Sequence, residues 1–215
     1  RSTLFPYTTL FRSERWGHPD WREVAAVPGK SDLDPLLATG PDRVVVVGTD
    51  SSLAAVALRL LRMERLSSTA VGFVPLAYKD STVARLWNLP ADREAAVELA
   101  LAGAAGAVPL VRDDSGGVLL GLGRLGPVDG EAYCDDQLAL RGRAKVIEVT
   151  PGPAGVAARV VRGGLRRPAV FTGRAVQIGC HPTTAVHDGI THPRPVTRWT
   201  WYRHTEDLRA ISLPG

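Results

Sequence analysis

The sequence predicts an α/β parallel-sheet domain followed by an antiparallel β-sandwich domain. Three observations predict this fold class. Before about residue 106, short apolar runs alternate with helical patterns, as strands and helices do along a parallel sheet. The run Val44–Val47 places four β-branched residues in succession, which is typical of a strand covered on both faces. After residue 107, short alternating segments are separated by Gly, Pro and Asp turns, as between antiparallel strands.

Each expected element follows from a local pattern. In the first part, apolar runs predict strands and capped periodic segments predict helices; Pro90 ends one helix, and Asp92 with Glu94 opens the next. The strands are expected at 23–27, 44–47 and 71–76, and the helices at 32–39, from about 53, from 82 and at 92–105. In the second part, strands are expected at 118–122, 145–149, 156–161, 169–172, 175–178 and 196–202. We therefore assign residues 14–106 to the α/β domain and residues 107–215 to the β-sandwich.

The first 13 residues are left out of this fold prediction. Residues 3–13 match the conceptual translation of a common short-read sequencing adapter, so we interpret residues 1–13 as an artefact. The alternative is an authentic strand, since Thr, Leu, Phe and Tyr all suit one. With residues 1–13 excluded, we expect the first strand of the parallel sheet to be missing.

The segment Val44–Leu53 carries the strongest functional signal. Gly48 is expected to end the strand, and Ser51 or Ser52 to cap a helix that begins near Leu53. Backbone N–H groups at such a helix start attract anions. Asp50 would repel a phosphate unless a divalent cation lay between them, so we predict that Asp50 binds magnesium. The alternative is a simple turn that Asp50 closes as an Asx turn.

Two later segments extend this pattern. A second buried strand ends at Pro75-Leu76 and is followed by a short helix containing Ala84-Arg85, which ends at Leu89-Pro90. Near the C-terminus, Asp188-Gly189 follows an alternating segment. With Gly48-Thr49-Asp50-Ser51-Ser52-Leu53, these segments resemble the catalytic domain of bacterial diacylglycerol kinases and related lipid kinases. In that family one strand ends in GGDGT-L, a second is followed by P-L-G-T-x-N-D-F-A-R-x-L-x-L-P, and an Asp-Gly-Glu motif comes late in the chain.

The resemblance implies a function and a set of site residues. It implies transfer of the γ-phosphoryl group of ATP to a lipid hydroxyl, with ATP and Mg²⁺ as cofactors, by an α/β nucleotide-binding domain followed by a β-sandwich as in NAD kinases and diacylglycerol kinases. The implied nucleotide-binding residues are Gly48, Thr49, Asp50, Ser51, Ser52, Ala77 and Tyr78. Asp50 is the implied metal ligand, and Asp50 and Asp188 are the implied catalytic residues, which we expect to converge in space.

The departures from the family pattern keep other functions open. Thr49 and Ser51 replace glycines, Ala77–Ser81 replaces the Gly-Thr-x-Asn-Asp segment, and Ile190, which cannot accept a proton, replaces the glutamate of the third motif. A non-catalytic pseudokinase that binds nucleotide or lipid is therefore an alternative. An NAD kinase-like enzyme is a second one, although such enzymes use an Asn-Glu pair and no Asn-Glu dipeptide occurs here.

Two nearby features are given structural interpretations. The literal Asp129-Gly130-Glu131 comes too early for the family motif, and we expect Asp129-Gly130 to form a hairpin turn. His187, next to a turn, could in principle accept a proton, but we expect it at the surface. Trp199 and Trp201 have the period-two spacing of a strand face packed on a core, which we favour over contact with lipid headgroups.

Composition limits the partners. A formal net charge of +4 over 215 residues calls for no nucleic acid, and no apolar stretch is long enough to span a bilayer, so we expect at most peripheral membrane contact. Cys134 and Cys180 are expected to be free thiols in a reducing cytoplasm. A metal site formed by Cys180-His181 with later histidines matches no recognised spacing and is disfavoured. The oligomeric state is not predicted.

Overall fold

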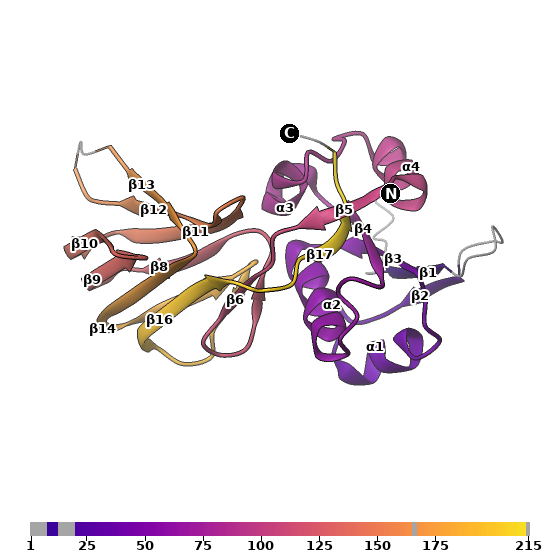
Figure 1. The fold of residues 1–215 in the computed structure, drawn as a ribbon, viewed down its shortest axis with the longest axis horizontal. Helices are drawn as coiled ribbons and strands as arrows, with labels where there is room; N and C mark the ends of the chain where they lie inside the picture. The colour runs from indigo at the N-terminus through magenta and orange to yellow at the C-terminus, as the bar shows by residue number, and fades with distance from the viewer. Residues whose placement is uncertain (1–7, 13–19, 165–166, 214–215) are drawn as a thin grey trace, which may run out of the picture. The chain divides into compact units, whose positions relative to one another are not determined.

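The computed structural model describes residues 8–12, 20–164 and 167–213, which form two compact units (Figure 1). The first unit contains the described residues up to Val108 together with those from Glu206 onward. The second unit runs from Pro109 to Thr205. Each unit has its own hydrophobic core, and each is described by itself.

A six-stranded sheet forms the centre of the first unit. Its strands are β1 (Thr8–Arg12), β2 (Asp20–Glu23), β3 (Arg43–Gly48), β4 (Ala70–Pro75), β5 (Ala105–Val108) and β17 (Leu208–Ile211). They lie in the order β2-β1-β3-β4-β17-β5. The central pairs β3–β4 and β4–β17 are parallel, whereas β1 and β5 join antiparallel to β3 and β17. The expected parallel strands therefore form the centre of the sheet, and antiparallel pairs flank them on both sides.

Helices cover this sheet. They are α1 (Lys30–Leu37), α2 (Asp50–Arg62), the 3-10 helix η1 (Tyr78–Asp80), α3 (Thr82–Leu86) and α4 (Arg93–Ala102). Helix α4 packs on Val45, Val47 and Val74, and a Cβ added at Gly72 would lie 2.7 Å from the carbonyl oxygen of Ala100. The valines of β3 are all buried, with at most 8% of any one exposed, which confirms that both faces of this strand are covered.

The N-terminal region differs from expectation. Residues 8–12 form β1 between β2 and β3, which agrees with the alternative of a strand built from Thr, Leu and Phe; the adapter origin of residues 1–13 stays a prediction. The strand expected at Glu23–Val27 is wrong, because β2 ends at Glu23. Glu23 pairs with Thr8, which is the first described residue of β1, so β2 has no further described partner in β1 beyond Glu23. Pro28 and Gly29, which follow soon afterwards, also disfavour a longer strand.

The end of the chain returns to the first unit. Ala210 of β17 lies opposite Val71 of β4, and β17 pairs along its length with β5. The β-rich second unit thus ends at Thr205 instead of at residue 215. The cause is the open edge of β4, whose ladder groups β17 pairs.

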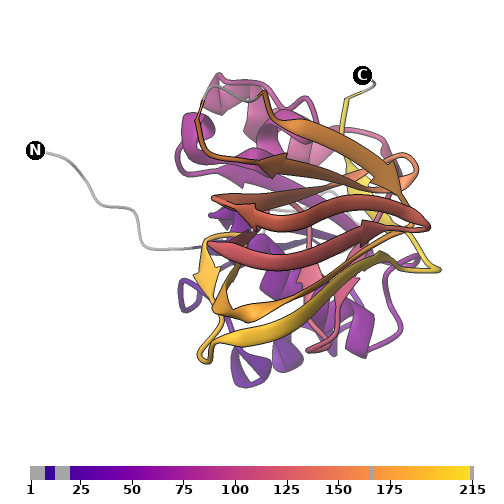
Figure 2. The same ribbon diagram turned by 90° about the vertical axis from the view of Figure 1, so that its left-hand side faces the viewer.

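The second unit is antiparallel throughout its described strand pairs, as expected. Its strands are β6 (Val111–Asp113), β7 (Val118–Leu119), β8 (Gly123–Gly126), β9 (Val128–Cys134), β10 (Gln137–Ala144), β11 (Val146–Gly152), β12 (Gly155–Val161), β13 (Ala169–Gly173), β14 (Ala175–His187), β15 (Ile190–Thr191) and β16 (Val196–Arg203). Figure 2 shows this unit from the side. The long β14 joins two sheets, because residues 176–180 pair with β9 and residues 184–187 pair with β8. Both sheets share one core, in which Trp199 and Trp201 are 3% and 0% exposed, so the core interpretation of these tryptophans is confirmed.

Of the two Asp-Gly pairs, the one expected to form a hairpin turn lies in a strand, and the other forms a turn. Asp129-Gly130 lies inside β9, so its assignment to a hairpin turn is wrong. Gly130 faces Cys180 of β14, and a Cβ there would lie 2.1 Å from the carbonyl oxygen of Gly179. Asp188-Gly189 instead forms the two-residue turn between β14 and β15, with φ angles of 46° and 87°.

Candidate functional site

The candidate site of the first unit lies where β3 and β4 end. Gly48 is in register with Pro75, and the amide of Leu76 donates a 2.9 Å hydrogen bond to the carbonyl of Gly48. The chain leaves β3 into α2 and leaves β4 into η1 and α3. Both loops therefore lie at the carboxyl edge of two parallel strands, where open α/β sheets bind their ligands.

The start of α2 is fixed by a reciprocal capping arrangement. Thr49 caps the helix: its Oγ1 accepts from the amide of Ser52, and the Oγ of Ser52 accepts from the amide of Thr49 at 3.1 Å. The expectation that Ser51 or Ser52 caps a helix near Leu53 is therefore wrong. The helix begins at Asp50, three residues earlier, because the side chain of Thr49 already satisfies the first-turn amide of Ser52.

Ser52 and Gly48 are packed against each other. Ser52 is 4% exposed, and its hydroxyl donates to the carbonyl of Ala26 at 2.6 Å. A Cβ added at Gly48 would lie 2.7 Å from both the Cβ and the Oγ of Ser52. Ser52 thus anchors α2 to the loop between β2 and α1, and the absence of a side chain at Gly48 makes room for this anchor.

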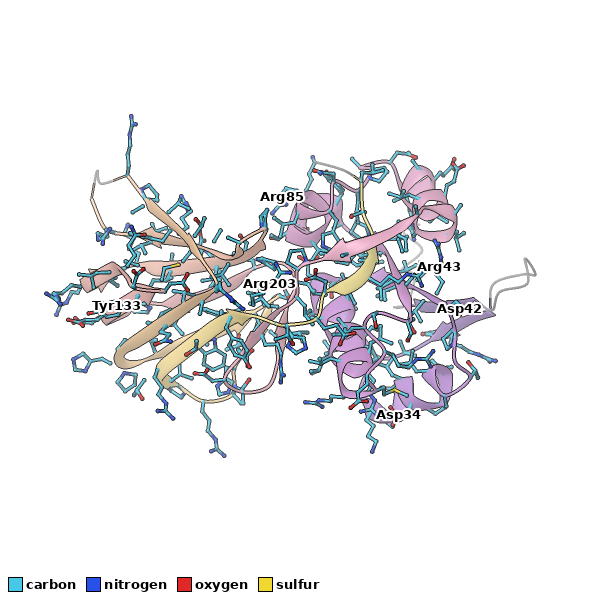
Figure 3. All side chains as sticks on the ribbon, viewed as in Figure 1. Asp34, Asp42, Arg43, Arg85, Tyr133 and Arg203 are labelled. Atoms are coloured by element: carbon cyan, nitrogen blue, oxygen red, sulfur yellow. The ribbon has the colours of Figure 1, made fainter. Side chains whose placement is uncertain are left out.

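Asp50 joins the two loops. Its carboxylate accepts hydrogen bonds from the hydroxyl of Ser81 and from the amides of Thr82 and Val83, the latter two at 2.8 and 3.2 Å. These are the first amides of α3, so Asp50 caps that short helix from outside. Arg85, which is labelled in Figure 3, also holds this loop. Its guanidinium donates to the carbonyl of Lys79 at 2.9 Å and to the hydroxyl of Thr82 at 3.1 Å.

The predicted nucleotide-binding residues lie from the end of β3 to the first turn of α2 and between β4 and α3. They differ in access. Thr49 and Ala77 are exposed, Asp50, Ser51 and Tyr78 are half-buried, and Gly48 and Ser52 are buried. The accessible polar groups include the hydroxyls of Thr49 and Ser51, which lie 2.7 Å apart at the first turn of α2.

The ligands available near Asp50 fit a magnesium ion that is held mainly by water and nucleotide phosphates. No group of three or more His, Cys, Asp or Glu side chains is arranged to hold a metal in the described ranges. An ionised carboxylate has about four acceptor positions, and the three donors to Asp50 leave about one of them. Magnesium is commonly held by one or two carboxylates, several waters and substrate phosphates. The site fits an ion that arrives with a nucleotide, and it does not fit an ion enclosed by protein ligands.

Asp188 belongs to the second unit and is 6% exposed. One carboxylate oxygen accepts from the amides of Gly121 and Leu122 at 2.8 and 2.9 Å, and the other accepts from the amide of Leu120 at 3.0 Å. The carboxylate therefore holds the backbone between β7 and β8. This use of its lone pairs makes Asp188 a poor acceptor for a substrate proton.

His187, which precedes Asp188, forms a contact that the sequence did not predict. The Nδ1 of His187 lies 3.0 Å from the Oδ2 of Asp113, and the side chain of His187 is only 15% exposed. The expectation of a surface histidine is wrong, because the ring packs edge-on against Trp199 and Trp201 at 5.1 and 6.4 Å between centroids. No pattern in the sequence links Asp113 to His187, which are brought together by β6 and β14 pairing with β16.

Asp113 is buried and fixed in place. Its Oδ1 accepts from the amide and hydroxyl of Ser115 and from the amide of Gly117, at 2.8, 2.6 and 3.0 Å. Its Oδ2 faces Nδ1 of His187 but has no hydrogen-bond donor of good geometry in the described residues. Burial acts to raise the pKa of Asp113, but the His187 contact and the hydrogen bonds from Ser115 and Gly117 together lower it.

The cysteines behave as the sequence indicates. Cys134 and Cys180 are free thiols, and burial raises the pKa of each, which disfavours the reactive thiolate. No metal cluster involves Cys180 and the later histidines in the described part of the chain. None of the described helices has the length and apolar character needed to cross a bilayer.

This fold, an α/β domain and an antiparallel β domain, is similar to that of solved diacylglycerol kinase and NAD kinase structures. A diacylglycerol kinase from Bacillus anthracis superposes with a TM-score of 0.67 at 12% identity, over 86% of this chain and 82% of that one. An NAD kinase from Archaeoglobus fulgidus, in complex with ATP, superposes with a TM-score of 0.54 at 16% identity, over 82% of this chain and 80% of that one.

These likenesses establish the predicted fold class and the fold-level resemblance to diacylglycerol kinases. No family model matches the sequence. No curated protein matches it either. At such identities the shared property is the fold, and the chemistry has to be argued from the residues of this chain.

Proposed function

We propose that this chain is an ATP-dependent kinase that transfers the γ-phosphoryl group to the hydroxyl of a diacylglycerol-like lipid. The observation that supports the proposal most is the joint between Asp50 and the start of α3. It places an acidic group and a helix N-terminus at the carboxyl edge of β3 and β4, in a fold shared with diacylglycerol kinases.

Each unit has a separate task in this proposal. The first unit binds ATP: the amides of Asp50 and Ser51 in the first turn of α2 and the hydroxyls of Thr49 and Ser51 bind phosphate oxygens, and Ala77 and Tyr78 contact the rest of the nucleotide. Asp50 holds Mg²⁺ through its remaining acceptor position. Magnesium, when bound, neutralises charge on the transferring phosphoryl group.

The second unit holds Asp188, the other aspartate that the family pattern assigns to catalysis. Asp188 contributes by fixing the turn between β14 and β15, since its carboxylate is directed to the amides of residues 120–122. We place the protein in the cytoplasm, with at most peripheral contact to the membrane that supplies the lipid.

A non-catalytic pseudokinase is the second candidate, and one observation favours it. Donors of the protein itself, mostly backbone amides, occupy most acceptor positions of Asp50 and Asp188, the two aspartates that the family pattern assigns to catalysis. A chain that kept these aspartates for structure alone would bind nucleotide or lipid without turnover.

The decisive experiment measures binding and turnover on the same protein. Calorimetric titration with magnesium-ATP is followed by transfer of labelled γ-phosphate to diacylglycerol in mixed micelles, with NAD as the competing acceptor. The proposal expects binding and labelled lipid. Binding without turnover supports the pseudokinase, labelled NAD supports the NAD kinase-like alternative, and no binding overturns all three nucleotide-based functions.

A matched pair of variants locates the nucleotide. Asp50→Asn keeps a carbonyl oxygen for the α3 amides but removes the charge that would hold magnesium. We expect at least a tenfold loss of magnesium-ATP affinity, with secondary structure intact. Asp80→Asn removes an exposed carboxylate from the same loop and should leave the affinity unchanged. Equal affinities for the two variants would place the nucleotide elsewhere.

A further inference from the structure

We propose that the outer face of strands β9, β14 and β16 in the second unit binds a small zwitterion, a molecule that carries an ammonium group and an oxyanion a few bonds apart. The site is a hollow of about 590 Å³, which is within the usual size of small-molecule pockets. All the residues that line it belong to the second unit, so this inference is independent of the kinase function proposed above.

The hollow exists because a glycine lies in the central strand of the three. Gly179 of β14 is in register with Glu131 of β9 on one side and with Arg198 of β16 on the other. These three residues are exposed, whereas the adjacent residues of the same strands point into the core, as alternation along a strand requires. A Cβ added at Gly179 would meet no atom within 4 Å. The missing side chain therefore leaves an open space flanked by Glu131 and Arg198.

The next row of the same face supplies neutral polar groups and a ring. Gln177 is in register with Tyr133 of β9 and with Thr200 of β16, and all three line the hollow. The side chains of Gln177 and Thr200 have no hydrogen-bond partner within the described ranges, so both can bond a ligand. Tyr133 is 36% exposed and pairs across β9 and β10 with Leu138, which is 42% exposed. This end of the hollow can contact an apolar part of the ligand.

The charges of the hollow are only partly compensated by the protein. Glu131 accepts hydrogen bonds from Arg141 at 2.9 Å and from the hydroxyl of Tyr133 at 3.1 Å, so its charge has a partner. Arg198 and Asp114 also line the hollow. Neither side chain forms an ion pair or a hydrogen bond in the part of the chain that the structure describes. The hollow thus offers one available cation and one available anion.

This pair of charges selects the class of ligand. A guanidinium binds a carboxylate or phosphate with two parallel hydrogen bonds, and a carboxylate accepts from an ammonium group. Asp114 directly follows Asp113, the β6 partner of Trp201, and Arg198 lies three residues before Trp201 on β16. Diagonal neighbours on adjacent strands have Cβ atoms about 7–8 Å apart, which leaves room for a short ligand between the two charged groups.

A zwitterion satisfies both groups, whereas a molecule with a single charge satisfies one and is repelled by the other. An anion would bind Arg198 but would be disfavoured by Asp114, and a cation would have the opposite problem. Two sources share the required chemistry: a free α-amino acid and the ethanolamine phosphate headgroup of a lipid. The experiment below distinguishes them.

The test is a calorimetric titration of the full chain with matched ligands. L-Phenylalanine and sn-glycero-3-phosphoethanolamine are the two zwitterionic probes. Phenylacetate and 2-phenylethylamine each keep one of the two charges of phenylalanine. We expect saturable binding of at least one zwitterion, and the zwitterion that binds identifies the source. The analogues with a single charge should bind about tenfold more weakly or not at all, because one charged group of the protein is left without a partner. Absence of binding by both zwitterions, or equal binding by a singly charged analogue, overturns the proposal.

Gly179→Val tests the location without disturbing the fold. Its side chain enters open space, and valine suits a strand, so the unfolding midpoint should not fall while the zwitterion is excluded. Gly106→Val in β5 is the matched control, because a Cβ there also meets no atom within 4 Å, and it should keep the affinity of the wild type. Unchanged zwitterion binding in Gly179→Val would place the ligand elsewhere and overturn the proposal.

Charge variants test the two recognition groups. Arg198→Gln and Asp114→Asn should each lower the affinity for the zwitterion by about tenfold. Arg143→Gln and Asp136→Asn are the controls, since both remove an exposed charge of the second unit outside the hollow and should leave the affinity unchanged. Equal affinities for Arg198→Gln and Arg143→Gln would overturn the role of Arg198. Failure of magnesium-ATP to bind the wild type would overturn the kinase and leave this site standing.

Discussion

The carboxylate of Asp50, in the first turn of α2, accepts a 2.8 Å hydrogen bond from the amide of Thr82, the first residue of α3. This bond joins the two loops that leave β3 and β4. Asp50 therefore has a structural task before any ligand binds, and the experiments must separate that task from magnesium binding.

Asp50→Ala removes the acceptor of the α3 amides. We expect a loss of about 1–3 kcal/mol in the free energy of unfolding, because the amides of Thr82 and Val83 lose their partner. Asp50→Asn should lose less, since it keeps one acceptor oxygen. Urea unfolding followed by circular dichroism measures both. Asp80→Ala is the control for loss of charge, and an equal loss in Asp50→Ala and Asp80→Ala would contradict the capping role.

Gly48→Ala tests whether the glycine that ends β3 serves packing. The added Cβ would lie 2.7 Å from Ser52, whose side chain is held by the carbonyl of Ala26, so we expect about 1–3 kcal/mol of destabilisation. Gly106→Ala is the matched control, because a Cβ added there meets no atom within 4 Å. Chemical unfolding of the two variants should separate them; equal midpoints would show that Gly48 is not restricted by Ser52.

Asp113 should make the free energy of unfolding decrease at acid pH. Its pKa in the folded chain lies below the ordinary value of 3.8, because the contact with His187 and the hydrogen bonds from Ser115 and Gly117 outweigh the opposing effect of burial. The ionised form thus stabilises the fold above the unfolded-state pKa of about 3.9, and this contribution is lost as the pH falls through the folded-state pKa. Unfolding free energies of the wild type should fall more steeply below pH 4 than those of Asp113→Asn. The exposed Asp114→Asn should keep the wild-type slope.

Gly130→Ala tests the literal Asp129-Gly130-Glu131. The Cβ would lie 2.1 Å from the carbonyl oxygen of Gly179 and 2.6 Å from the Cα of Cys180, so strands β9 and β14 would have to separate. We expect destabilisation of about 3 kcal/mol, at the upper end for overpacking, in a thermal unfolding scan. The carboxylate of Glu131 accepts from Arg141 and from the hydroxyl of Tyr133 at the exposed surface, so Glu131→Ala should change stability by less than about 1 kcal/mol. Similar losses in both would argue against a packing role for Gly130.

Local patterns predicted much of the fold. The valines of β3, the helices α1, α3 and α4 and the strand β4 have unambiguous periodicity or end signals, and each forms close to its expected bounds. Strands β8, β9 and β10 were not predicted, because Gly, Asp and Arg interrupt their alternation and the sheet forms there through backbone pairing. The cap of α2 was misplaced because Thr49, Ser51 and Ser52 are all good capping residues, and only the hydrogen bonds distinguish them.

The sequence by itself determined the two-part architecture and the candidate nucleotide edge at Gly48–Ser52, because hydrophobic periodicity and turn residues act over short distances along the chain. Only the tertiary structure decided that β17 returns to the first unit, that Asp50 caps α3, and that Asp113 faces His187. Each of these contacts joins residues far apart in sequence, and which partner a buried carboxylate finds depends on strand register, which no local pattern encodes.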